Sequence, residues 1–285
     1  MFATLACVAA MYLTPLVWMI STSLKPEAQA TDGSLRLLPV PASSVVERAR
    51  ANYYGEEAAG GAWKPGVWTD PSVDFPRFMR NTLVVCALSV TGMVISSAVV
   101  AYGFSRVRWR GRGLVFGVML ATMMIPFAVL MGPLYVIFGR LGLIGTLAPL
   151  WLPAWFGGAF NIFLLRQFYM QVPRELDEAA RMDGCGHWGT FWRVIVPMSR
   201  PALAVVALYH FMFVWNDFLA PMVFLTHRDD FTLALGLQMY QSKAGNTPWN
   251  LLMAASTLVV APVLLLFVLA QRQLVSGLSA GSVKE

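Results

Sequence analysis

The chain has 285 residues, of which 57% are hydrophobic and 13% are charged, and its mean hydropathy is +0.60. A water-soluble domain carries roughly 25% charged residues, so this composition excludes an ordinary soluble enzyme or binding module. The net charge of +6 is not gathered on one polar domain, which makes nucleic-acid binding a poor explanation of it. The apolar residues come in blocks instead, and about 20 consecutive apolar residues span a bilayer.

Six apolar blocks predict an all-α membrane protein with about six transmembrane helices, because backbone polar groups in lipid must be satisfied within the segment. The blocks cover residues 2–23, 82–104, 114–138, 147–165, 201–225 and 251–270. The first block lacks the basic start and the small-residue cleavage site of a signal peptide, and Pro15 and Trp18 interrupt it. We therefore expect residues 1–24 to be a retained first transmembrane helix. Kinks are expected in the other spans at four prolines, either beside a cavity or through packing. These are Pro126, Pro133, Pro153 and Pro221.

Residues 25–80 form the longest polar segment, and they contain six prolines and the pair Gly60–Gly61. Residues 45–54 alone have the pattern of a short helix, so the rest is expected to be irregular. The aromatic residues of this segment could anchor it at the lipid headgroups or contact a partner protein. They are Tyr53, Tyr54, Trp63 and Trp68.

The basic residues predict the orientation of the chain. Three segments carry most of the basic residues near the predicted spans: loop 105–113, loop 166–200 and the tail after residue 270. An even number of spans separates each segment from the next, so all three lie on the same side of the membrane. The positive-inside rule places that side in the cytoplasm, with both termini. We expect an extracytoplasmic segment over 25–80 and a core of five further spans over 81–285, with a cytoplasmic loop at 171–200 and a cytoplasmic tail at 271–285.

The loop at 171–200 contains a second short helix pattern, which begins near Pro173 and ends at Gly184. The helix is too short and too charged to span a membrane. Its internal ion pairs are expected at spacing i, i+4, between Arg174 and Glu178 and between Asp177 and Arg181, unless these charges meet a partner. One narrow face is expected to hold the residues Leu176, Ala179, Ala180 and Asp183. On amphipathicity alone, a solvated loop helix held by these pairs is the favoured interpretation.

The run Glu178-Ala179-Ala180, followed by Gly184 and then by Val194, Val196 and Pro197, resembles the Glu-Ala-Ala loop of ABC-importer permeases. This sequence departs from the family pattern only in having valine at positions 194 and 196, where isoleucine and leucine are usual. The resemblance implies a type I ABC-importer permease fold in which this loop forms a coupling helix that docks in a cleft of a separate ATPase. By position, the implied coupling residues are Glu175, Glu178, Ala179, Ala180, Asp183, Gly184 and Pro197.

No G-x-x-x-x-G-K-[ST] run occurs in the sequence, so this chain is not expected to bind or hydrolyse ATP. The resemblance implies ATP and magnesium at the partner ATPase and no cofactor on this chain, which is therefore expected to have no catalytic residues. No metal site is expected either, because His210 and His227 lack a partner at ligand spacing. The three cysteines imply neither a disulfide nor a metal site.

Four further stretches resemble carbohydrate-type permeases, in particular the maltose-type second permease subunit: residues 15–26, 123–146, 213–225 and the tail 271–285. The resemblance implies a bacterial inner-membrane permease that moves a di- or oligosaccharide into the cytoplasm by alternating access. The implied partners are membrane lipid, a second permease subunit, an ATPase homodimer and an extracytoplasmic sugar-binding protein. Residues 30–70 are longer than is usual in that family.

Three sets of residues follow from this resemblance and from the cost of burying polar groups in a span. The tail residues Gly277, Ser279 and Gly281 would contact the ATPase, unless the tail is simply flexible. The outward loop 226–249 would reach the binding protein through Tyr240, Gln241 and Asn246. The substrate path would include Tyr135, Asn161, Trp215, Asn216 and Asp217, although Asp217 could instead contact the other permease chain.

Two other classes of protein also have several spans. A membrane-embedded transferase for lipid-linked substrates would need clustered carboxylates or histidines, and the pair Asp229–Asp230 stands alone in the sequence. A secondary transporter would use coupling charges in discontinuous helices and often has internal repeats, which are not evident here. Both alternatives leave the loop from Glu178 to Pro197 without a role.

Overall fold

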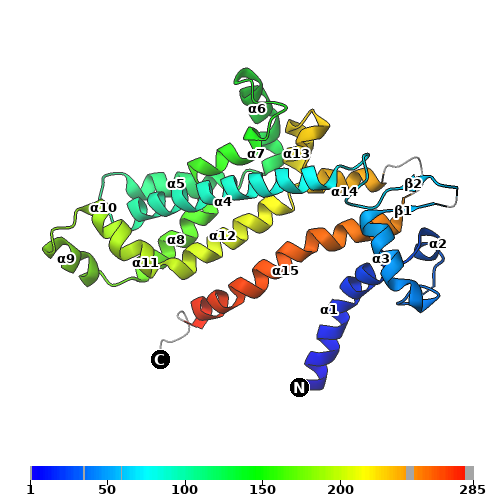
Figure 1. Ribbon diagram of the computed structural model, residues 1–285. Coiled ribbons are helices and arrows are strands. Elements are labelled where there is room, and N and C mark those ends of the chain that lie inside the picture. Colours follow the sequence, from blue (N-terminus) through cyan, green and yellow to red (C-terminus); the bar gives the residue numbers. More distant parts are fainter. Residues whose placement is uncertain (1, 35, 59, 242–246, 280–285) are drawn as a thin grey trace. The chain divides into compact units, whose positions relative to one another are not determined.

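The computed structural model describes residues 2–34, 36–58, 60–241 and 247–279. This part of the chain is mostly helical, and it divides into two compact units (Figure 1). The first unit comprises residues 1–81 and 231–265, and the second comprises residues 82–230 and 266–285. Two long helices, α4 (Phe75–Ser105) and α15 (Trp249–Ser279), contribute to both units.

The first unit combines long apolar helices with the polar segment that follows α1. Its elements besides α4 and α15 are α1 (Phe2–Ser23), α2 (Glu27–Ala30), η1 (Ala42–Ser44), α3 (Val45–Tyr54), β1 (Glu56–Glu57), β2 (Trp63–Lys64) and α14 (Leu233–Gln241). Strands β1 and β2 pair antiparallel, with Glu56 opposite Lys64. The short helix predicted at residues 45–54 is confirmed as α3.

One buried amide joins three parts of the first unit. Asn52 of α3 donates from Nδ2 to the carbonyl oxygens of Ser23 (2.7 Å) and Lys25 (2.8 Å). Its Oδ1 accepts a hydrogen bond from Nδ2 of Asn250, near the start of α15 (2.8 Å). Lys25 itself is 1% exposed, and its ammonium lies 4.4 Å from the ring centroid of Trp18. The end of α1, helix α3 and the start of α15 are therefore held together by polar contacts.

The second unit contains the remaining elements. They are α5 (Arg112–Thr122), α6 (Phe127–Arg140), α7 (Ala148–Trp151), η2 (Leu152–Phe156), α8 (Ala159–Gln171), α9 (Glu175–Met182), α10 (His187–Thr190), the π-helical turn η3 (Phe191–Ile195), α11 (Val196–Met198), α12 (Arg200–Trp215), α13 (Leu219–Phe224) and η4 (Arg228–Asp230). Its core lies where α4, α8 and α12 pack together with η3. Fully buried members of this core include Ala101, Leu165, Tyr169, Ile195 and Val206.

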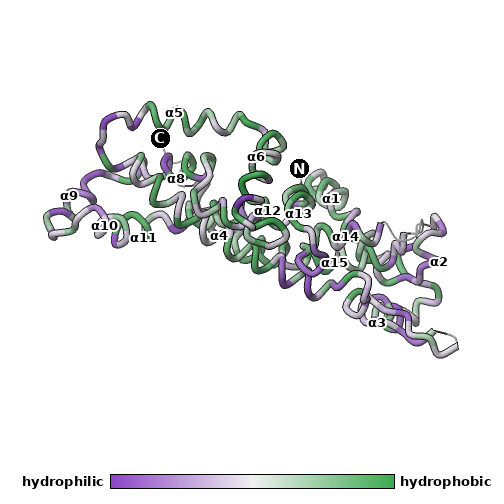
Figure 2. Tube along the Cα trace, turned by 90° about the horizontal axis from the view of Figure 1, so that it is seen from above, coloured by the Kyte–Doolittle hydropathy of each residue, from purple (hydrophilic) through white to green (hydrophobic). Residues whose placement is uncertain are grey.

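The number of membrane spans agrees with the prediction of about six. Among the described residues, four helical segments are long and apolar enough to cross a membrane: Thr4–Ser23, Phe75–Ser105, Ala148–Gln171 and Trp249–Gln271. Two further spans result if each of two bent helix pairs is one span, α5 with α6 (98°) and His187–Met198 with α12 (77°). Many large apolar side chains along these helices point outward, including Leu114 (75% exposed) and Leu265 (61%). Figure 2 shows the apolar colouring along α1, α5 and α15. A lipid environment suits such surfaces.

Two predicted spans are not the straight helices that their hydropathy suggested. The block at 114–138 breaks before Pro126, whose backbone is extended, so the predicted kink at this proline is confirmed. The block at 201–225 ends its first helix at Trp215, and α13 is a separate element. Local hydrogen bonds explain this second break: Asn216 donates to the carbonyl of Met212 (2.7 Å), and Oδ1 of Asp217 accepts from the backbone N–H of Ala220 (3.2 Å).

Candidate functional site

Helix α9 forms the polar end of the second unit, together with α10 (Figures 1 and 2). It starts at Glu175, because the carbonyl of Arg174 accepts the first hydrogen bonds, from the N–H groups of Asp177 (2.9 Å) and Glu178 (3.1 Å). Pro173 therefore precedes the helix, whereas the sequence placed it in the first turn. Three acidic residues lie in the first turn, where their negative charge interacts favourably with the positive end of the helix dipole.

The predicted end of α9 at Gly184 is confirmed, and its hydrogen bonds form a Schellman motif. The N–H of Cys185 donates to the carbonyl of Ala180 (2.9 Å), and the N–H of Gly184 donates to that of Arg181 (3.0 Å). Gly184 has φ +80°, a left-handed conformation that glycine adopts without the steric cost of a side chain. A Cβ atom at this position would meet no atom within 4 Å, so only the backbone conformation demands glycine.

Arg106, in the turn after α4, fastens the start of α9 to the helices of the second unit. Its Nη1 lies 2.9 Å from Oδ2 of Asp177, and its Nη2 donates to the carbonyls of Tyr169 and Val172 at the end of α8. The two ionic side chains are 4% and 14% exposed. A charge-assisted contact of this kind in a dry setting has a defined geometry and is stronger than a neutral hydrogen bond.

The ion pairs that the sequence predicted within α9 are wrong for Asp177. Its carboxylate turns toward Arg106, which is 71 residues away in the chain, rather than toward Arg181 one turn along the helix. Between Arg174 and Glu178, both described, there is no ion pair either. The physical reason is that the carboxylate gains more from a buried guanidinium than from an exposed i, i+4 partner, whose contribution is only about 0.3–0.5 kcal/mol.

The two faces of α9 differ in their surroundings. Ala180 is 5% exposed and packs inward with Asp177, whereas Met182 is 84% exposed and Leu176 is 36% exposed. The face of α9 predicted from the sequence therefore does not face one environment: Ala180 is buried, whereas Leu176, Ala179 and Asp183 are exposed. The exposed residues of the predicted coupling set are Glu175, Glu178, Ala179, Asp183, Gly184 and Pro197.

The segment after α9 is anchored through its aromatic and aliphatic side chains. Phe191 (1% exposed) and Ile195 (fully buried) belong to the core of the second unit, and the ring of Phe191 lies 5.1 Å from that of Tyr102. Pro197 follows in α11, where its missing N–H is tolerated in the first turn. Loop 171–200 is thus fixed at two places, by an ion pair in the first turn of α9 and by apolar packing after the helix.

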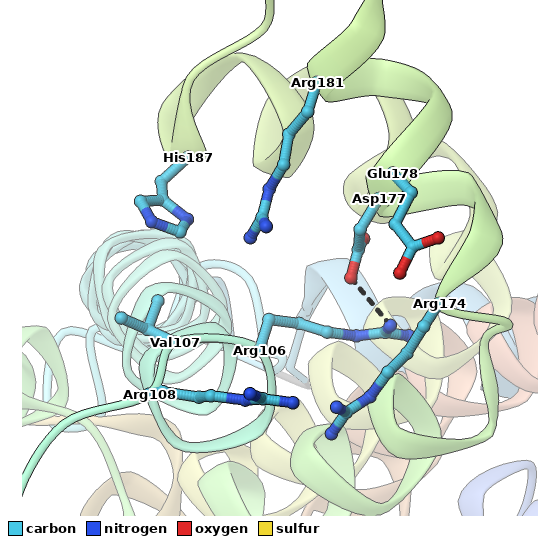
Figure 3. A pocket seen from close by; sticks show the side chains of 8 residues that line it. All are labelled: Arg106, Val107, Arg108, Arg174, Asp177, Glu178, Arg181 and His187. Carbon is cyan, nitrogen blue, oxygen red and sulfur yellow. Dashed lines mark hydrogen bonds and ion pairs between the residues drawn. The ribbon is translucent and has the colours of Figure 1, made fainter.

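A cleft with a volume of about 380 Å³ opens between α9, α10 and the turn after α4 (Figure 3). Its lining is mostly charged and consists of Arg106, Val107, Arg108, Arg174, Asp177, Glu178, Arg181 and His187. The sequence reasoning used the arginines of loop 105–113 only as a sign of orientation. It therefore missed that Arg106 and Arg108 come to lie beside α9.

The residues predicted for a substrate path lie on several elements of the second unit. Tyr135 is 45% exposed on α6, and Asn161 is 5% exposed on α8. Trp215 is buried at the end of α12, and its ring stacks on Phe211 at 5.2 Å. Asn216 and Asp217 make the local hydrogen bonds that separate α12 from α13. Asp217 thus has a local structural role that neither of its two predicted roles included.

The residues outside loop 171–200 that were predicted to contact partner proteins differ in how exposed they are. Tyr240 is fully buried in α14, so its side chain cannot form a surface for a binding protein, whereas Gln241 is exposed. Asn246 and Gly281 lie outside the described residues. The backbone of α15 continues through Ser279, so Gly277 and Ser279 are helical rather than part of a flexible end. In the described part of the chain, no group of three histidine, cysteine, aspartate or glutamate residues could hold a metal ion.

The fold and the anchored loop define a multi-pass helical membrane protein with a rigid polar element between two of its spans. The family model for the binding-protein-dependent transport system inner membrane component matches residues 87–280, which include α9 and its anchors. The chain belongs to this family. The predicted identity as an ABC-importer permease is thereby confirmed, and neither a secondary transporter nor a lipid-linked transferase is favoured.

Individual relatives and one solved structure agree with this family. The chain is 33% identical over 220 residues to the trehalose/maltose transport system permease protein MalG of Thermococcus litoralis, covering 76% of this chain and 79% of the relative. It is 31% identical to the arabinooligosaccharides transport system permease protein AraQ of Halalkalibacterium halodurans, covering 99% and 94%. A crystal structure of a bacterial ABC transporter involved in the import of the acidic polysaccharide alginate matches with a TM-score of 0.76 at 24% identity, covering 95% and 93%, which shows the fold.

Proposed function

We propose that this chain is the carbohydrate-translocating permease subunit of an ABC importer and that α9 receives the motion of a separate ATPase. The observation that carries the second part is the anchoring of loop 171–200. Arg106 holds the start of α9, and Phe191 and Ile195 hold the segment after it. A short helix fixed at both ends transmits a displacement to the spans, whereas a flexible loop would absorb it.

The exposed face of α9 is the proposed docking surface for the ATPase. Met182 offers an apolar contact, Ala179 permits close approach, and Glu175 and Glu178 offer charges beside them. Leu176, 36% exposed, lies at the edge of this face next to the buried Ala180. Small and apolar residues surrounded by polar ones are a common composition of a protein interface. In this proposal the buried Ala180 serves the internal packing of α9, and Gly184 closes the helix so that the chain can turn back toward the spans.

ATP and magnesium are proposed to bind at the ATPase, with no cofactor on this chain. The sequence contains no G-x-x-x-x-G-K-[ST] motif for binding the phosphates of ATP, which supports the proposal that a separate chain hydrolyses ATP. The proposed orientation places loop 171–200 and both termini in the cytoplasm and residues 25–80 outside, in accordance with the arginines of loop 105–113. The remaining proposed partners are a second permease subunit and, as the family description indicates, an extracytoplasmic binding protein.

A di- or oligosaccharide is the proposed cargo, because the relatives named above are described as carriers of trehalose or maltose and of arabinooligosaccharides. Within this chain, the proposed contributions to the substrate path are Tyr135, Asn161 and the segment from Trp215 to Asp217. Asn161 supports this placement, since Oδ1 of its buried amide has no hydrogen-bond partner among the described residues. Contact with the binding protein is proposed for the exposed Gln241, and contact with the ATPase for the end of α15.

The substitution Ala179→Glu tests the docking of the ATPase. Ala179 is exposed on α9, so a larger charged side chain changes the proposed interface without disturbing the buried contacts of Asp177 and Ala180. The measurements are co-purification of the ATPase and ATP-dependent sugar uptake into proteoliposomes. Both are expected to fall at least 10-fold. The matched control is Ala42→Glu, which adds the same charge at an exposed alanine of η1 and is expected to leave both unchanged. Normal uptake by the Ala179→Glu variant would refute the assignment of α9.

A further inference from the structure

The cleft beside α9 carries an excess of positive charge that its own side chains do not neutralise. Four arginines line it together with two acids, so two positive charges remain even with His187 neutral. Among the lining residues, all of which the structure describes, Asp177 is paired with Arg106. No ion pair within 4.0 Å holds Arg108, Arg174 or Arg181.

These arginines gather around the same space. In Figure 3, Arg108 and Arg174 extend toward each other at one side of the cleft, and Arg181 points into it from α9. Like charges that share a cleft repel one another, and the repulsion grows where protein replaces water. A guanidinium is always charged and presents several donors in one plane, which suits phosphate oxygens in particular. The arrangement is therefore that of an anion site.

Arg106 supplies a second, independent sign of a ligand. Its side chain is 4% exposed at the wall of the cleft, yet its Nε has no hydrogen-bond partner among the described residues. A buried donor without a partner is unfavourable, and a negative charge in the adjoining cleft would stabilise the guanidinium that carries it. The unpaired Oδ1 of Asp177 and the carboxylate of Glu178 oppose an anion, but the four arginines outweigh them.

An apolar surface begins directly beside the cleft. Nη1 of Arg112, the first residue of α5, donates to the carbonyl of the cleft residue Val107 (3.1 Å) and so fixes the start of α5 there. Leu114 (75% exposed) and Val118 (59%) follow on α5 with their side chains outward. A ligand that fits both features has an anionic head and apolar chains.

We propose that this cleft binds the phosphate of an anionic phospholipid, whose acyl chains lie along α5. Basic clusters directly beside a transmembrane helix on the cytoplasmic side are a known recognition mode for anionic lipids, worth about 1 kcal/mol for each basic residue, or about 5-fold in affinity. The adjoining apolar surface favours a lipid over free phosphate and over an acidic segment of the ATPase. The bound headgroup would bring α4, α5 and α9 into contact with one ligand and so brace α9. The inference does not depend on the identity of the sugar.

The test uses the full-length chain in detergent, with native mass spectrometry to measure retention of added phosphatidylglycerol against phosphatidylcholine. The wild-type chain is expected to retain phosphatidylglycerol selectively. The variant Arg108→Ala with Arg174→Ala is expected to bind it about 30-fold more weakly, and Arg181→Ala, on the other wall, about 5-fold. The matched control, Arg110→Ala with Arg200→Ala, removes the same charge from exposed positions that do not line the cleft and is expected to bind normally.

Two further arms separate the sources of the anion. Glycerol phosphate and inorganic phosphate at millimolar concentration are expected to compete poorly, because they lack acyl chains. Full competition by either would overturn the lipid proposal in favour of a soluble phosphate ligand. Equal retention of phosphatidylglycerol by the wild type and all the variants would overturn the site itself. If the cleft variants keep the lipid but lose the ATPase, the cleft receives an acidic protein segment instead. In each of these cases the proposed transport function still stands.

Discussion

The two polar segments of this protein are each held by one buried side chain, but the chemistry of the two side chains differs. Asn52 ties α3 to the end of α1 and to α15 through neutral hydrogen bonds of 2.7–2.8 Å. Arg106 ties α9 to the end of α8 through two carbonyls and the Asp177 carboxylate. The amide lies in the segment proposed to face outward, and the ion pair lies beside the proposed ATPase site.

The difference follows from what each contact has to withstand. A neutral amide can be lost with a modest penalty, whereas removing one partner of a buried ion pair leaves an uncompensated charge. The ion pair therefore restricts the position of α9 more strongly than the neutral hydrogen bonds restrict α3. It lies where, in the proposed function, α9 must transmit the motion of the ATPase to the spans. The outer segment needs only to remain packed.

The largest effect is expected from Arg106→Met. This change leaves Asp177 without its partner and removes the donor to the carbonyls of Tyr169 and Val172, at a cost of about 3–5 kcal/mol. Thermal unfolding in detergent should show a large drop in melting temperature, and ATP-dependent uptake should be lost. The control is Arg110→Met, an exposed arginine of the same loop, which should behave as the wild type.

A second substitution shows whether charge is the cause. Asp177→Leu combined with Arg106→Met removes both charges, and apolar pairs that replace buried ion pairs are often as stable as the pair itself. The double variant should therefore recover most of the lost melting temperature but not the uptake. A double variant no more stable than Arg106→Met alone would mean that the carbonyl contacts, rather than the ion pair, hold α9.

A smaller effect is expected from Asn52→Leu. The change removes the hydrogen bonds to the carbonyls of Ser23 and Lys25 and to the amide of Asn250, at a cost of about 0.5–1.5 kcal/mol for each. The melting temperature should fall while ATPase binding stays normal, because α9 belongs to the other unit. The matched control is Gln29→Leu, an exposed amide that also makes two hydrogen bonds to the backbone, both with Val40. Its effect should be clearly smaller. Equal effects would show that burial of Asn52 is not what matters.

Gly184→Ala is expected to have a local effect on α9. The new Cβ has room, so the cost is the left-handed backbone alone, about 1–2 kcal/mol. Hydrogen–deuterium exchange should rise at the N–H groups of Gly184 and Cys185, which close the helix. Gly184→Asn should be milder, because asparagine tolerates this conformation better. Unchanged exchange in both variants would contradict the strain argument.

The smallest effect is expected at the ion pair of Arg48 with Glu56 in the first unit. Its atoms are 3.2 Å apart, but the two side chains are 31% and 36% exposed. Solvent screening limits such a pair to about 0–1 kcal/mol. Arg48→Ala should therefore leave the melting temperature almost unchanged. A drop as large as that of Arg106→Met would remove the contrast between exposed and buried ion pairs.

The parts of the fold that depend on local sequence were predictable. The number of apolar spans, helix α3 and the end of α9 at Gly184 follow from hydropathy and from glycine chemistry, although the first helix of the 201–225 block ends ten residues early, at Trp215. The pairing of Arg106 with Asp177 was not predictable, because the two residues are 71 positions apart and i, i+4 partners were available nearby. Likewise, the break after Trp215 depends on hydrogen bonds of Asn216 and Asp217 that an average over apolar residues does not detect.

The site was predictable as a motif and not as a structure. The spacing from Glu178 to Pro197 located the loop, but only the folded structure shows that Ala180 faces inward and that Tyr240 is buried. Burial depends on which elements pack together, and a single sequence does not state this. The arginines of loop 105–113 were already explained by the orientation of the chain, so nothing in the sequence suggested that they also line a cleft.

The division of α9 into two faces has a consequence for how such proteins diverge. The residues that fix the helix, Asp177 and Ala180, point inward, and those proposed to meet the ATPase, such as Ala179 and Met182, point outward. If α9 docks the ATPase as proposed, substitutions on the outer face alter which ATPase binds without disturbing the folding of the permease. A descendant of this chain would then take up a different ATPase by changing a few surface residues, while the cargo pathway stays as it was inherited.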